Sequence, residues 1–130
     1  MKATLYFDGA SLGNPGKRAI GVVLKTPTKT YKFKKEIGEG TSNQAEYYAL
    51  IAGMMLAKKL GIKELTVKGD SELVIKQMRG EYRVRDPILR KLYEKAKELE
   101  RAFKKVSYEW IPREENKEAD RLATEALKGG

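Results

Sequence analysis

Four aspartates stand among fourteen glutamates in this chain, and two of these aspartates directly follow apolar segments. Asp8 comes after Leu5–Phe7, and Asp70 closes a short segment that begins at Leu65. Both segments are expected to be strands, and open sheets with parallel strands bind ligands beyond the carboxyl ends of those strands. If the two strands are neighbours, they lie about 4.8 Å apart. Carboxylates at that separation repel, so they require a cation, a shared proton or hydrogen-bond donors.

Two further acids are expected on helices that pack against the sheet. Glu46 lies in the first turns of an apolar helix, on the face that carries Ala49 and Leu50. A charged group on such a face is costly unless it is paired or bound to a metal. Asp120 lies one position off the apolar stripe of the last helix, where it faces the sheet edge. Either acid alone also fits a helix N-terminus stabilised by the helix dipole, whereas all four together indicate a functional site.

The absence of two residue types narrows the chemistry that such a site can perform. The sequence of 130 residues contains no histidine and no cysteine. This excludes Ser-His-Asp triads, imidazole acid–base chemistry, thiolate nucleophiles and disulfides. Carboxylates remain, and hard oxygen ligands select Mg²⁺ or Mn²⁺ over zinc.

The charge of the chain indicates the kind of partner it binds. There are 27 Lys and Arg against 18 Asp and Glu, which gives a formal net charge of +9 and favours a polyanion such as nucleic acid. A second interpretation stays open, because a chain with 35% charged residues also fits the surface of a thermostable or an engineered protein. The longest apolar run, at 49–57, spans nine residues, whereas a membrane helix needs about 20. We therefore expect no membrane association and, since no signal peptide is recognisable, a cytoplasmic location.

Hydrophobic patterning and turn residues predict the elements that position the acids. Strands are expected over 3–8, 20–26, 31–37, 65–68 and 106–111, with loops over 9–16 and 112–115. Helices are expected over 44–60, 71–78, 87–103 and 116–129, with a capping box of Thr41 and Gln44 before the first and N-caps at Asp86 and Asn116. A long helix between two strands makes those strands parallel. The order βββαβααβα predicts one α/β domain over residues 1–130, with a five-stranded mixed sheet flanked by helices.

Four segments resemble, in the right order, the motifs of the type 1 ribonuclease H family. They read D-G-A-S-L-G-N-P-G at 8–16, T-S-N-Q-A-E at 41–46, G-D-S at 69–71 and Y-E-W-I-P-R-E-E-N-K-E-A-D at 108–120. The resemblance covers essentially the whole chain, and the set of four is highly specific. The chain departs from the family where Ala10 replaces the usual serine. It also lacks the histidine that many bacterial members carry in the loop before the last helix, so it is similar to an archaeal-like short form.

The resemblance implies a ribonuclease H-like fold and hydrolysis of the RNA strand of RNA–DNA hybrids, with 5′-phosphate and 3′-hydroxyl ends as products. It also implies Asp8, Glu46, Asp70 and Asp120 as catalytic ligands of two Mg²⁺ or Mn²⁺ ions. In the family's scheme Asp8 bridges both ions, Asp120 completes the ion that activates water, and Glu46 and Asp70 complete the ion at the leaving oxygen. Two divalent ions roughly 3.5–4 Å apart suit an in-line displacement that needs no histidine base.

Substrate contacts are implied by the same resemblance. The RNA side is expected to meet Gly9, Ala10, Ser11, Leu12, Asn14, Asn43 and Gln44. For Asn14, Asn43 and Gln44, ordinary turn and cap roles are the alternative. Arg79, Arg83 and Arg85 are expected to hold phosphates of the DNA strand, with a solvated basic face as the alternative. Glu114 or Glu115 is the hypothesised auxiliary group in place of the missing histidine.

Two other functions compete with the leading one. The first is a catalytically silent module that binds RNA–DNA hybrids, and the intact set of four acids disfavours it. The second is a nuclease of the same fold that acts on double-stranded RNA or on RNA–DNA junctions. A monomer suffices for any of these activities.

Overall fold

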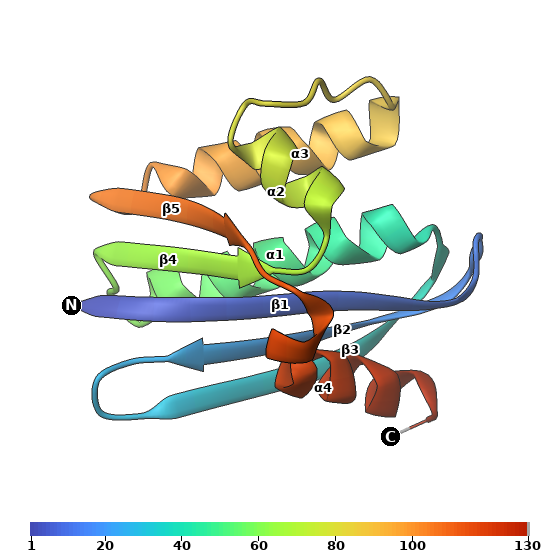
Figure 1. Ribbon diagram of the computed structural model, residues 1–130, viewed down its shortest axis with the longest axis horizontal. Helices are drawn as coiled ribbons and strands as arrows, with labels where there is room; N and C mark the ends of the chain where they lie inside the picture. Colours follow the sequence, from blue (N-terminus) through green and yellow to red (C-terminus); the bar gives the residue numbers. More distant parts are fainter. Residues whose placement is uncertain (130) are drawn as a thin grey trace.

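The computed structural model describes residues 1–129, which form a five-stranded sheet with helices packed around it (Figure 1). In chain order the elements are β1 (Lys2–Gly13), β2 (Gly16–Lys25), β3 (Thr30–Gly40), α1 (Ser42–Lys59), β4 (Glu64–Gly69), α2 (Glu72–Met78), α3 (Pro87–Glu100), β5 (Lys105–Trp110), a 3₁₀ turn (Arg113–Glu115) and α4 (Lys117–Leu127). Within this part of the chain no helix is long and apolar enough to cross a membrane.

The strand order in the sheet is β3-β2-β1-β4-β5. β1 pairs with β2 and β2 with β3 in antiparallel fashion, whereas β1 pairs with β4 and β4 with β5 in parallel. The predicted fold class and the parallel crossover through α1 are therefore confirmed. The register of the parallel pair places Phe7 opposite Gly69, so Asp8, which continues β1, and Asp70, which follows β4, lie side by side.

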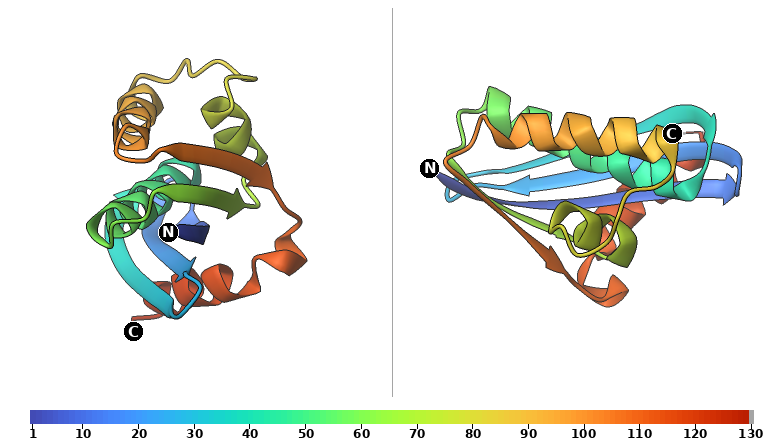
Figure 2. Two further views of the ribbon diagram at one scale, coloured as in Figure 1. Left: turned by 90° about the vertical axis from the view of Figure 1, so that its left-hand side faces the viewer. Right: turned by 90° about the horizontal axis from the view of Figure 1, so that it is seen from above.

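Both faces of the sheet are covered. The left view of Figure 2 shows α1 and α3 on one side and α4 on the other. Val22 and Leu24 of β2 belong to the main core, which also contains Leu50 of α1, whereas Val23 packs with Leu122 of α4. Because alternate residues of a strand point to opposite faces, β2 needs apolar residues at successive positions. Its I-G-V-V-L segment meets that need.

The glycine-rich segment 9–16, expected to be a loop, is mostly strand. β1 continues to Gly13 and pairs with β2 as far as Gly16, so only Asn14 and Pro15 form the turn. Pairing with β2 satisfies the backbone groups of this segment, and it outweighs the low strand preference of small and glycine residues. The prediction was wrong because glycine was interpreted as loop-forming.

The helix boundaries follow local capping. The capping box is present: the Gln44 N–H donates to Thr41 Oγ1 at 3.2 Å, and the Thr41 N–H donates to Gln44 Oε1 at 3.0 Å. Asp86 also caps as predicted, since its Oδ2 accepts from the Leu89 N–H at 2.9 Å. α3 ends at Glu100 rather than at residue 103, because the N–H groups of residues 101–103 bond three residues back instead of four.

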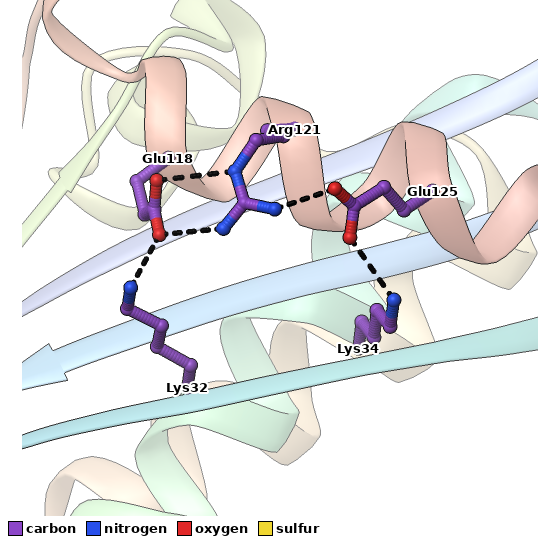
Figure 3. Close-up of polar contacts among 5 residues, drawn as sticks. All are labelled: Lys32, Lys34, Glu118, Arg121 and Glu125. Carbon is purple, nitrogen blue, oxygen red and sulfur yellow. Dashed lines mark hydrogen bonds and ion pairs between the residues drawn. The ribbon is translucent and has the colours of Figure 1, made fainter. Parts of the chain in front are cut away.

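Ion pairs tie the outer face of α4 to the edge strand β3 (Figure 3). Lys32 Nζ lies 2.6 Å from Glu118 Oε2, and Lys34 Nζ lies 3.0 Å from Glu125 Oε1. Arg121 joins the two halves, with contacts of 2.7 Å to Glu118 and 2.5 Å to Glu125. Hydrogen bonds from Arg121 and Lys32 lower the pKa of Glu118 to about 2. Exposed pairs of this kind stabilise weakly, so the packing of α4 on β2 contributes more to its position than these pairs do.

The inner face of α4 lies against β2 at Gly21. A Cβ atom added to Gly21 would lie 2.1 Å from the Ala119 carbonyl oxygen and 2.7 Å from the Ala123 nitrogen. The helix that carries Asp120 can therefore approach the sheet only because this position has no side chain.

Replacing Gly21 by alanine should displace α4 and cost about 2 kcal/mol or more of unfolding free energy. Gly61→Ala is the matched control: its φ is +77° and nothing lies within 4 Å of an added Cβ, so only the left-handed backbone is penalised, by about 1 kcal/mol. Urea unfolding of both variants measures the difference. Equal destabilisation by the two substitutions would contradict the close packing described for α4.

Candidate active site

Four carboxylates from four different elements line one cavity of about 560 Å³. Asp8 lies on β1, Glu46 on α1, Asp70 directly after β4, and Asp120 on α4. The structure thus brings together the four acids that the sequence singled out. Parallel pairing of β1 with β4 brings Asp8 and Asp70 together. The close approach of α1 and α4 to the sheet adds Glu46 and Asp120.

Three of the acids form one mutually close cluster, and the fourth lies beside Asp8. Carboxylate oxygens of Asp8, Glu46 and Asp70 all lie within 4.8 Å of one another. Asp120 lines the same cavity, and its Oδ1 lies 3.8 Å from an amino nitrogen of the exposed Arg113. The cavity is therefore a cluster of three carboxylates with a fourth beside it.

Glu46 is held in place by the backbone of β1. The Gly9 N–H donates to Glu46 Oε1 at 3.0 Å. A Cβ atom on Gly9 would lie 2.3 Å from the Ala45 carbonyl carbon, so any other residue would push α1 away. Gly9, expected as a substrate contact, thus has a structural role as well.

The surroundings of Asp8 and Glu46 disfavour the ionised forms of these two acids. Burial, followed by the charge of Asp70 and the proximity of Asp120, raises the pKa of Asp8 from 3.8 to about 8. Burial, followed by the charges of Asp8 and Asp70, also raises the pKa of Glu46. Protons and metal cations compete for such a cluster, because either one relieves the repulsion. Oxygen ligands at these separations suit Mg²⁺ or Mn²⁺.

The side chain of Asn116 supports this site rather than capping a helix. Asn116 occupies the N-cap position of α4, as predicted, but its side chain makes no capping bond. Its Nδ2 instead donates to the Phe7 carbonyl oxygen at 2.9 Å and to Asp70 Oδ2 at 3.2 Å. The sequence contains no signal for this, since an asparagine before a helix is an ordinary cap. Arg113 was also missed, because its place beside Asp120 depends on the 3₁₀ turn.

The residues expected on the RNA side occupy several environments. Gly9, Ala10 and Ser11 line the cavity with the acids. Leu12 and Asn43 are exposed, near the β1–β2 turn and at the start of α1 respectively. Asn14 Oδ1 accepts from the Ser42 N–H at 3.1 Å, which links the turn to α1.

Gln44 has mainly structural contacts through its side-chain oxygen. Besides capping α1, Gln44 Oε1 accepts from Arg18 at 3.0 Å. The Arg18 guanidinium also donates to the carbonyl oxygens of Ile37 and Gly38, both at 3.2 Å. Gln44 therefore belongs to a network that joins β2, β3 and the start of α1.

The remaining candidates are not among the residues that line the acid cavity. Arg79, Arg83 and Arg85 are exposed in and before the connection between α2 and α3, at the top of Figure 1, and Arg79 pairs with Glu81 at 2.8 Å. Glu114 and Glu115 are exposed in the 3₁₀ turn, whose Arg113 faces the cavity instead.

Comparisons with known proteins define the family. The model of the reverse transcriptase-like family matches residues 6–126. A ribonuclease HI of Halobacterium salinarum is 44% identical over 124 residues, which cover 94% of this chain and 62% of that protein. The crystal structure of ribonuclease H1 from this archaeon superposes with a TM-score of 0.96 at 42% identity, over 100% of both chains. The chain belongs to the reverse transcriptase-like family and is a ribonuclease H-like domain.

Two further relatives show how the domain occurs elsewhere. A bifunctional protein of Mycobacterium tuberculosis is 45% identical over 130 residues, which cover 98% of this chain and 36% of that protein. The solved N-terminal RNase H domain of that protein gives a TM-score of 0.94 at 44% identity, over 98% of this chain and 99% of the solved one. LC11-RNase H1, solved in complex with an RNA/DNA hybrid, gives a TM-score of 0.89 at 36% identity, over 98% of this chain and 97% of the solved one. This chain spans about a third of the length of the mycobacterial relatives.

The raised pKa of Asp8 makes the stability of the metal-free protein depend on pH. In the unfolded chain Asp8 ionises near 3.8, whereas in the folded chain it keeps its proton up to about 8. Between these values the unfolded state binds fewer protons, so stability is lost as the pH rises. Asp8→Asn removes this loss. In EDTA its melting temperature should exceed that of the wild type by roughly 5 °C or more at pH 8, and by less at pH 5.

Asp86→Asn is the control for this prediction, because it makes the same chemical change at a helix cap that asparagine also fills well. Its melting temperature should track that of the wild type at both pH values. A difference between Asp8→Asn and wild type that does not grow with pH would contradict the description of a clustered, partly protonated site.

Proposed function

We propose that this chain hydrolyses the RNA strand of RNA–DNA hybrids with two divalent metal ions, Mg²⁺ or Mn²⁺, and leaves 5′-phosphate and 3′-hydroxyl ends. The observation that carries the proposal is the convergence of Asp8, Glu46, Asp70 and Asp120 on one cavity. A protein fold gains no stability from four acids held together, so their cost is explained by a function. The similarity to ribonuclease HI and to a hybrid-bound ribonuclease H1 supports the choice of substrate.

The carboxylates divide into two sets under this proposal. Asp8 would contribute to both ions, Asp120 with it to one, and Glu46 and Asp70 to the other. Ions bound there would supply Lewis-acid stabilisation of the attacking and leaving oxygens in an in-line displacement. The Gly9 N–H fixes one oxygen of Glu46, and Arg113 adds positive charge beside Asp120 at 3.8 Å. Neither binding of the ions nor positioning of Glu46 and Asp120 requires a histidine in this scheme.

Substrate recognition is proposed along two surfaces. The RNA strand would meet residues at the end of β1, in the β1–β2 turn and at the start of α1. These are Ala10, Ser11, Leu12, Asn14, Asn43 and Gln44. Small residues and exposed backbone suit the sensing of 2′-hydroxyl groups across a wide minor groove. Arg79, Arg83 and Arg85 would hold phosphates of the DNA strand, and the net charge of +9 would draw the hybrid in. A cytoplasmic monomer is proposed as the working form.

A cleavage assay tests the activity directly. Labelled RNA–DNA hybrid should be cut in Mg²⁺ or Mn²⁺ and left intact in EDTA, while double-stranded DNA is left intact under all conditions. Double-stranded RNA and an RNA–DNA junction, tested in parallel, define the substrate range. Hybrid binding without cleavage in either metal would identify a silent module and overturn the proposal.

Single substitutions test the assigned ligands. Asp8→Asn, Glu46→Gln, Asp70→Asn and Asp120→Asn should each lower the rate of hybrid cleavage at least about 100-fold, because each removes a charged ligand of an ion. Asp86→Asn, which makes the same change at the cap of α3, should cleave like the wild type. A cleavage rate within a few-fold of wild type for Asp8→Asn would exclude Asp8 as the shared ligand.

A further inference from the structure

Asn116 is a buried polar residue that links the segments carrying Asp8, Asp70 and Asp120. Its relative exposure is 1%, although it lies between a 3₁₀ turn and the start of α4. The two Nδ2 contacts reach two different strands: the Phe7 carbonyl oxygen belongs to β1, and Asp70 follows β4. Its own backbone carbonyl accepts from the Asp120 N–H at 3.1 Å. One residue therefore contacts Asp70, the peptide that precedes Asp8, and the helical turn that carries Asp120.

The orientation of this side chain is fixed by its partners. A carboxamide nitrogen has two hydrogens, and both are directed at acceptors here. Turning the group over would set Oδ1 against the Phe7 carbonyl and the Asp70 carboxylate, and oxygen facing oxygen is repulsive. The bond to Asp70 in turn engages one carboxylate oxygen, Oδ2, and so limits rotation of that side chain.

The hydrogen bonding of the Asn116 side chain is incomplete on its oxygen side. Asn116 Oδ1 is buried without a hydrogen-bond partner among the described residues. A buried acceptor left unpaired is destabilising, and native proteins rarely keep one without a reason. A helix cap is not the reason, because the side chain makes no capping bond. The remaining reason is the pair of hydrogen bonds that Nδ2 donates, one to the Phe7 carbonyl of β1 and one to Asp70.

We propose that Asn116 is a positioning residue, which sets the carboxylate of Asp70 and the spacing of β1, β4 and α4 for divalent-metal binding. This inference rests on the proposed metal-dependent function and identifies a residue beyond its four ligands. Groups that hydrogen-bond to metal ligands typically change metal affinity by about 10–100-fold when removed. Asn116 does not itself need to touch metal or substrate.

Asn116→Leu tests the proposal, since leucine has similar size and cannot donate. At pH 7 and a temperature at which all variants are folded, Mn²⁺ affinity measured by calorimetry should fall about tenfold or more. Gln77→Leu is the matched control: Gln77 is also a buried amide with two strong contacts, to the Tyr47 hydroxyl at 2.6 Å and the Arg83 carbonyl at 3.1 Å. It should lower stability and leave the Mn²⁺ affinity unchanged.

Nuclear magnetic resonance of the wild-type protein provides a second readout. This readout does not depend on whether a substituted protein folds. The Asn116 side-chain amide protons should exchange slowly with solvent and shift on addition of Mg²⁺, because their acceptor Asp70 becomes a ligand. Those of Gln77 should not shift. Equal Mn²⁺ affinities of wild type and Asn116→Leu, or Asn116 protons that do not respond to Mg²⁺, would overturn the role of Asn116 and leave the proposed function intact. A wild type that binds no Mn²⁺ would overturn both.

Discussion

Electrostatic repulsion among clustered carboxylates is the constraint on which the other features of this structure depend. Oxygens of Asp8, Glu46 and Asp70 lie within 4.8 Å of one another, and isolated side chains would move apart. They stay together because each is attached to an element that cannot move without breaking a core. β1 and β4 share backbone hydrogen bonds, and α1 packs closely on β1 at Gly9. The packing energy of the whole domain thus keeps a locally unfavourable arrangement in place.

The distribution of charge over the molecule follows from the same constraint. A chain with net charge +9 concentrates three of its four aspartates at one cavity, while lysines and arginines cover much of the remaining surface. Such a surface attracts a polyanion from a distance, and the acidic cavity would repel its phosphates at contact. Bound divalent cations remove that conflict. Metal and nucleic acid are therefore expected to bind with positive coupling, since each screens the charge that disfavours the other.

The sequence predicted the parts of the fold that rest on local chemistry. The capping box at Thr41 and the cap at Asp86 mark helix starts because their bonds form within a few residues. The proximity of Asp8 and Asp70 was also predictable, since each comes directly after the apolar residues of a predicted strand, although β1 in fact continues beyond Asp8. Contacts between distant segments were not: the strand character of 9–13 depends on pairing with β2, and the function of Asn116 depends on a neighbour 46 residues away. The residue pattern around the start of α4 did not indicate that the Asn116 side chain is buried.

The lysines of β3 have a consequence for how the molecule meets other molecules. β3 is an edge of the sheet, and an exposed edge can accept a strand from another chain. Lys32 and Lys34 stand on this strand with Lys35, and the first two are engaged by α4. An incoming strand of the same chain would bring its own lysines alongside them. A strand that paired with this edge would have to bring further lysines beside these two and Lys35, so the ion pairs with α4 and the lysine-rich edge together disfavour sheet-to-sheet association of two copies.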